Sequence, residues 1–191
     1  MAELKNGNPF DRAPIIISAL AISAIGALFY NLLPLFLGAA QDYRQLGNRE
    51  IGFISSAFFL GYNAVTIWAF FWIRRWSWRT ATWVALPIAA AGLLAGAWSE
   101  SYWMLLLSTT VAGGGFAAVY GIGTTVLADT SNPARWYGVK IAGEAFPGAV
   151  LLFVLPVTLI PEYGFSGVVY GMLIVCALLF PFLLTLLFPA G

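Results

Sequence analysis

Apolar residues are concentrated in six long runs along this sequence, and the charged side chains fall almost entirely in the gaps between the runs. A helix needs about 20 mostly apolar residues to cross the hydrocarbon core of a bilayer. The runs are long enough, so the pattern predicts an all-α membrane protein with six membrane-spanning helices in one domain, residues 1–191. We place these helices near residues 14–39, 51–73, 80–99, 101–128, 137–160 and 163–188.

Basic residues divide the gaps into two kinds that alternate along the chain. The N-terminal segment and the second and fourth gaps, with their edges, contain Lys5, Arg12, Arg74, Arg75, Arg79, Arg135 and Lys140. The first gap contains Arg44 and Arg49, and the third and fifth contain no Lys or Arg. Because an excess of Lys and Arg marks the cytoplasmic side, we expect a multi-pass protein of the cytoplasmic (inner or plasma) membrane. Both termini are expected in the cytoplasm.

Tryptophan and tyrosine give a second indication of where the spans end, since their rings favour the level of the lipid headgroups. Trp72, Trp76 and Trp78 lie around the second gap, and Trp98 and Trp103 lie around the third. No Trp falls at the middle of a predicted span, which agrees with the helix placement.

Composition argues against several classes of protein. Only 9% of the residues are charged, against about a quarter in ordinary globular domains, and the mean hydropathy is +0.86. A net charge of +1 offers no attraction for nucleic acid. The sequence has no histidine, which removes Ser-His hydrolases and His-based metal sites. No phosphate-binding Gly-Lys-Ser/Thr loop occurs, so no pattern argues for an enzyme, and we expect no metal and no cofactor.

The fourth predicted helix carries small residues at four-residue spacing. Gly113, Ala117 and Gly121 share one face, while Val119 falls on the opposite face. Membrane helices approach one another closely through small residues, so this stripe predicts a helix–helix contact. The alternative is that Gly and Ala are simply common in membrane helices. Similar stripes lead us to expect the first, second, fourth and fifth helices to pack closely or face a cavity, with the third and sixth peripheral.

Glu144 is the one acidic residue placed inside a span. Burying a carboxylate near the middle of a membrane helix costs about 2.5–3.5 kcal/mol on insertion scales, which makes such a residue a functional candidate. In that role it would bind a cation or carry a proton. The alternative is that Lys140, one turn earlier on the same face, neutralises it.

Other polar side chains within the spans are candidates for a substrate cavity. Buried amide and phenol groups need hydrogen-bond partners, so each either lines a cavity or bonds to a neighbouring helix. We favour cavity lining for Asn31 and interhelical bonding for Asn63. The full set of cavity candidates is Tyr30, Asn31, Tyr62, Asn63, Tyr120 and Glu144.

Four stretches together resemble the amino-terminal six-helix half of a major facilitator superfamily transporter. Residues 46–62, LGNREIGFISSAFFLGY, are similar to the family's entry into its second helix. The basic run at 74–79, the segment 109–117 and the stretch 127–138 stand where the family's other motifs belong. The resemblance implies a 3+3 inverted-repeat bundle that transports a small solute by alternating access. It also suggests a cytoplasmic gate of Arg74, Arg75 and Arg79 with Asp129, whereas the plainer role of these arginines is to fix topology and contact lipid phosphates.

The sequence departs from the family pattern in ways that affect function. Arg74 stands where the family usually has Asp, and Thr109 stands where it often has Arg. The family normally has twelve helices, so a working transporter would need a second six-helix half, from another copy, a separate chain or downstream sequence. The expected partners are therefore the lipid bilayer, an unidentified small molecule and that second half. The alternative function is a non-transporting membrane scaffold or assembly subunit with the same fold.

Overall fold

The computed structural model describes residues 8–183, and these form helices without any β-strand. Six helices of the described residues are long and apolar enough to cross a membrane. This agrees with the multi-pass membrane protein that the sequence predicts. The main helices are α1 (Ala13–Arg44), α2 (Asn48–Trp72), α3 (Trp78–Trp98), α4 (Tyr102–Ala128), α5 (Pro133–Val154) and α7 (Phe165–Leu179). The short elements are η1 (Pro9–Asp11), η2 (Leu155–Val157), α6 (Leu159–Tyr163) and η3 (Phe180–Leu183).

Local signals at the helix ends explain where the predicted boundaries differ from the structure. Helix α1 continues to Arg44, five residues beyond the expected end, and Gln45 then stops it with a left-handed backbone, φ 54°. Helix α5 begins at Pro133, four residues before its expected start. There Asn132 accepts a hydrogen bond from the Arg135 main-chain N–H, and Pro133 occupies the first turn, where no N–H is needed.

The end of α5 also lies earlier than expected. The helix stops at Val154 instead of Ile160, and the chain then turns through η2, which contains Pro156, and α6. Gly164 follows α6 with φ +58°, and a Cβ atom there would lie 2.9 Å from the ring of Tyr43. The last helix, α7, therefore starts at Phe165, and residues 184–188 of its predicted span lie outside the described residues.

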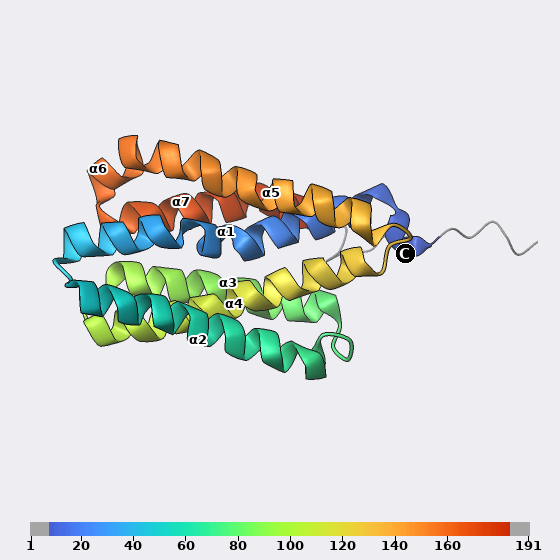
Figure 1. Cartoon of the computed structure of the whole chain (residues 1–191), viewed down its shortest axis with the longest axis horizontal. Coiled ribbons are helices and arrows are strands. Elements are labelled where there is room, and N and C mark those ends of the chain that lie inside the picture. The colour runs from blue at the N-terminus through green and yellow to red at the C-terminus, as the bar shows by residue number, and fades with distance from the viewer. Residues whose placement is uncertain (1–7, 184–191) are drawn as a thin grey trace, which may run out of the picture.

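Helices α1 and α4 lie side by side at the centre of the bundle (Figure 1). Helices α2 and α3 pack against α4, while α5 and α7 pack against α1. The start of α1, the α2–α3 connection and the α4–α5 connection all lie at one end of the bundle (Figure 1). Most of the arginines therefore gather at that end, which we call the arginine-rich end.

Glycines allow the central helices to touch backbone to backbone. A Cβ atom at Gly26 of α1 would lie 2.5 Å from the main chain of Tyr120, and one at Gly115 of α4 would lie 2.7 Å from the main chain of Ala89 in α3. Gly61 of α2 leaves equally little room beside Thr110. Lipid gives no hydrophobic reward for helix association, so this close van der Waals contact holds α1, α2 and α3 on α4.

The expectation that the third helix is peripheral is wrong. Its small residues Ala85, Ala89, Gly92 and Gly96 are buried, and Gly92 and Gly96 lie against α4. Their spacing changes from four residues to three, so no sustained four-residue stripe marks them in the sequence. Val119, on the face of α4 opposite the small-residue stripe, is also 0% exposed, because other helices surround α4 on more than one side.

Candidate functional site

The six polar residues singled out as cavity candidates line one cavity of about 440 Å³. They come from four helices: Tyr30 and Asn31 from α1, Tyr62 and Asn63 from α2, Tyr120 from α4 and Glu144 from α5. Ala27, Phe59, Ile141 and Ala145 complete the wall. The cavity lies at the side of the bundle, since Tyr30 is 53% exposed and Asn63 is also exposed.

Close helix contacts bring these side chains together. Gly26 lets α1 approach the main chain of Tyr120. Gly148 lets α5 approach Asn31, because a Cβ atom added at this glycine would lie only 2.8 Å from the Asn31 Cβ. The rings of Tyr62 and Tyr120 are 6.3 Å apart between centroids, so α2 and α4 present adjacent aromatic groups to the cavity. The cavity therefore combines phenol and amide groups with apolar side chains.

The two asparagines both lie in the cavity wall, but only Asn31 bonds to a neighbouring helix. Asn31 lines the cavity and also bonds between helices, because its Nδ2 donates to the main-chain carbonyl of Glu144 at 2.9 Å. Asn63, for which we favoured interhelical bonding, lies on an exposed position of α2 in the cavity wall. The amide of Asn31 thus positions α5 beside α1, whereas Asn63 is placed to meet whatever enters or covers the cavity.

A buried ion pair forms one side of the site. The Nζ of Lys140 lies 2.5 Å from Glu144 Oε1, one helical turn away, and the side chains are 3% and 11% exposed. Nζ also donates to the Tyr120 hydroxyl at 2.9 Å and lies 4.0 Å from the centroid of that ring. Buried ions need such additional partners, because their mutual attraction alone rarely offsets the loss of water. Glu144 is thus a neutralised carboxylate that keeps a small exposed edge.

Lys140 is the site residue that the sequence pattern placed wrongly. With the fifth helix expected to start at residue 137, Lys140 falls in its first turn, near the interface. The helix starts at Pro133, so Lys140 lies two turns inside and is buried. The N-cap Asn132 followed by Pro133 is the sequence signal that locates it.

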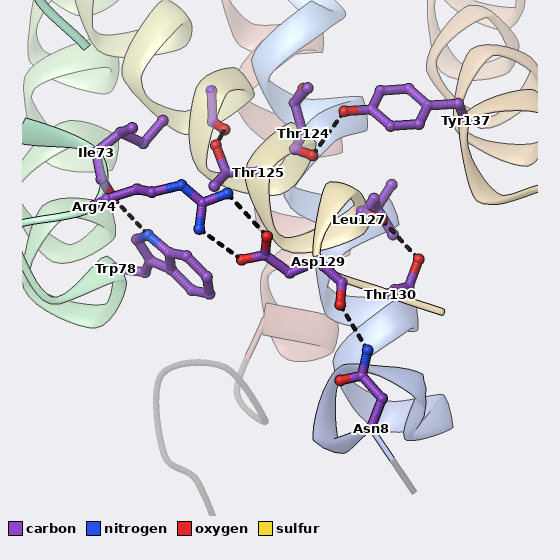
Figure 2. A network of polar contacts seen from close by, with 11 residues as sticks. Asn8, Ile73, Arg74, Trp78, Thr124, Thr125, Leu127, Asp129, Thr130 and Tyr137 are labelled. Carbon is purple, nitrogen blue, oxygen red and sulfur yellow. Dashed lines mark hydrogen bonds and ion pairs between the residues drawn. The ribbon is translucent and has the colours of Figure 1, made fainter. Parts of the chain in front are cut away.

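A second polar group joins the α2–α3 connection to the end of α4 at the arginine-rich end. Both terminal nitrogens of the Arg74 guanidinium donate to the Asp129 carboxylate, at 3.1 and 2.8 Å (Figure 2). These hydrogen bonds raise the pKa of Arg74. The main-chain carbonyl of Asp129 accepts from Asn8 Nδ2 at 2.7 Å, which adds the N-terminal segment to the group. Arg75 on the α2–α3 connection and Arg79 in the first turn of α3 are exposed.

The small-residue stripe on α4 faces α2 at two of its three positions. A Cβ at Gly113 would lie 2.5 Å from the Phe58 carbonyl oxygen, and one at Gly121 would lie 3.1 Å from Ile73 Cδ1. Ala117, between them, is 3% exposed. These contacts place the stripe where α2 crosses α4, beside the cavity wall formed by Tyr62 and Tyr120.

No protein-family model, curated protein or solved structure matches this chain. Within residues 8–183, no three His, Cys, Asp or Glu side chains come together in a way that would hold a metal ion. The proposed function therefore depends on the geometry of the cavity and of its charged pair.

Proposed function

We propose that this chain is one half of a membrane transporter that moves a small polar solute by alternating access. The observation that carries the proposal is the cavity, where six polar side chains from four apolar helices converge. Polar groups inside a membrane protein are costly, and they characteristically line solute pathways. The resemblance to the amino-terminal half of a major facilitator transporter leads to the same function.

The helix contacts support a bundle of two inverted three-helix repeats. In such a bundle α1 is equivalent to α4, α2 to α5 and α3 to α7. The α2–α4 contact then corresponds to the α5–α1 contact, and the α3–α4 contact corresponds to the α7–α1 contact. All of these contacts occur in the structure. Transporters built from inverted repeats place their substrate site at the interface between the repeats, and this cavity draws residues from both sets of three helices.

The charge of the cavity favours a solute without net charge. Lys140, inside the protein, neutralises the charge of Glu144. The other polar groups that line the cavity are phenols and amides, which carry no charge. These groups recognise hydroxyl and amide groups by hydrogen bonds. A volume of about 440 Å³ lies within the range of roughly 300–1,000 Å³ typical of small-molecule sites.

A second six-helix half would complete the cavity. The open side leaves Tyr30 and Asn63 exposed at a level where hydrocarbon would otherwise meet them, and polar groups in hydrocarbon are expensive. The partner is a second copy related by twofold symmetry, a separate chain or a downstream half. Cysteines at Tyr30 and Asn63 in native membranes are expected to crosslink to that partner, and their failure to crosslink would contradict this part of the proposal.

We further propose that the arginine-rich end is cytoplasmic and contributes to the gate. The Arg74–Asp129 pair holds the α2–α3 connection against α4. Arg75 on this connection and Arg79 in the first turn of α3 are exposed near the pair. Cytoplasmic termini in an inner or plasma membrane follow from the same excess of basic residues.

The alternative function is a membrane scaffold or assembly subunit. The observation that favours it is the broad apolar face of α2, where Leu60, Ile67, Trp68 and Phe70 are each at least 65% exposed. A scaffold would use this face to bind a partner and would move no solute.

Solute flux separates the two functions. Membrane vesicles that contain the protein are loaded with a panel of radiolabelled uncharged solutes, namely polyols, sugars and amides. A transporter is expected to release at least one of them faster than vesicles that lack the protein, and Tyr120→Phe and Asn31→Ala are expected to slow that release. If no solute is released faster while a partner is still retained on purification, the scaffold function is correct.

A further inference from the structure

A second hollow lies on another side of the bundle from the polar cavity. It is a groove of about 640 Å³ between α2 and α3, with α4 as its floor. The floor is made of Gly114, Gly115 and Ala118, whose small side chains leave the space open. The walls are formed by Trp68, Trp72 and Trp76 of the α2 side, and by Ala81, Val84 and Ile88 of α3.

The lining of this groove is apolar. Apart from the tryptophans, Thr110 is the one polar residue among the described residues that line it. The Thr110 hydroxyl already donates to the main-chain carbonyl of Leu106 at 2.9 Å. The groove therefore offers mainly dispersion contact, which suits a hydrocarbon chain.

The groove ends at the arginine-rich end of the bundle. Trp76, in the α2–α3 connection, and Ala81, in the first turn of α3, both line it. Arg75 directly precedes Trp76, and Arg79 lies two residues before Ala81. Both arginines are exposed. An apolar groove thus leads to exposed arginines among tryptophans, which favour the headgroup level.

We propose that this groove binds one acyl chain of an anionic phospholipid, whose phosphate contacts Arg75 and Arg79. Charge complementarity selects this occupant, since basic pockets between membrane helices bind anionic headgroups. The site is separate from the polar cavity, so it stands whether or not the chain transports a solute. A lipid that binds only the folded protein also stabilises it.

The test uses the purified full-length protein in detergent, titrated with phosphatidylglycerol or phosphatidylcholine and analysed by native mass spectrometry. We expect one phosphatidylglycerol to bind more tightly than phosphatidylcholine. Arg75→Gln and Arg79→Gln should each weaken binding about fivefold, since a basic residue at an anionic surface contributes about 1 kcal/mol. Arg135→Gln, an exposed arginine at the same end but outside the groove, is the matched control and should have no effect.

A second variant tests the acyl-chain site itself. Ala118→Phe fills the floor of the groove and should abolish the selective binding, whereas Ala149→Phe, at an exposed position of α5, should not. Equal binding of the two lipids, or an equal effect of Arg135→Gln, would overturn the proposal. Retained binding in Ala118→Phe would show that the headgroup binds without the groove. If Ala118→Phe does not fold, the arginine variants decide the question.

Discussion

Replacing Lys140 with methionine removes the cation that faces Glu144 and leaves a similar volume of apolar side chain. Lys140 is 3% exposed, so water cannot take its place beside the carboxylate. Breaking a buried ion pair by removing one partner destabilises a protein by about 3–5 kcal/mol. The Tyr120 hydroxyl also loses the 2.9 Å hydrogen bond that it accepts from Nζ. We therefore expect Lys140→Met to lower the free energy of unfolding by about 3–5 kcal/mol.

The assay is reversible unfolding in mixed micelles, followed by helical circular dichroism. The double variant Lys140→Met/Glu144→Gln removes both charges and should recover most of the loss, because a neutral pair of similar volume is often tolerated. Arg135→Met removes an exposed cation from the same helix and should change stability by less than about 0.5 kcal/mol. An unchanged stability of Lys140→Met, or a double variant as unstable as the single one, would refute the ion pair as a stabilising element.

Three further predictions follow from the packing and the charge pattern. Gly121→Leu, at the contact of α4 with Ile73, should destabilise the protein by the roughly 1–3 kcal/mol typical of overpacking. Val111→Leu, on the exposed edge of α4, should not destabilise it. Equal stability of the two variants would show that the Gly121 contact is not tightly packed. In a cysteine-free background, a cysteine at Gln45 should react with an impermeant thiol reagent outside intact cells and one at Ser77 should not; the reverse result would invert the topology. Arg74→Gln should leave stability nearly unchanged, because the Arg74 side chain is 63% exposed and exposed ion pairs contribute little. A clear loss of stability on thermal unfolding would mean that the pair is more than a surface contact.

The helices and the members of the cavity were predictable because their signals are local. Twenty or so apolar residues define each span, and polar residues such as Asn31 and Tyr62 stand out within them. Their convergence on one cavity depends on close helix approaches at glycines such as Gly26 and Gly148. Which helix lies opposite each of these glycines is a tertiary relationship, and no single-sequence pattern contains it.

The errors also have physical causes. The depth of Lys140 depended on one boundary, and the N-cap Asn132 moved that boundary by a full turn. The role of α3 was missed because its small residues change spacing between Ala89 and Gly92, although they still share a face. The burial of Val119, opposite the stripe, could not be predicted, because α4 is hydrophobic all round and this does not distinguish burial by protein from burial by lipid.

Under the proposed alternating access, the polar cavity opens in turn to the two sides of the membrane, and the side from which Asn63 can be labelled tests this most directly. This residue lines the cavity, and its exposed position lets a thiol reagent reach it. In a cysteine-free background, Asn63→Cys should react with an impermeant reagent in both right-side-out and inside-out vesicles. Cysteines at Gln45 and Ser77 should each react in one orientation alone. Reaction of Asn63→Cys from a single side, or from neither, would contradict alternating access through this cavity.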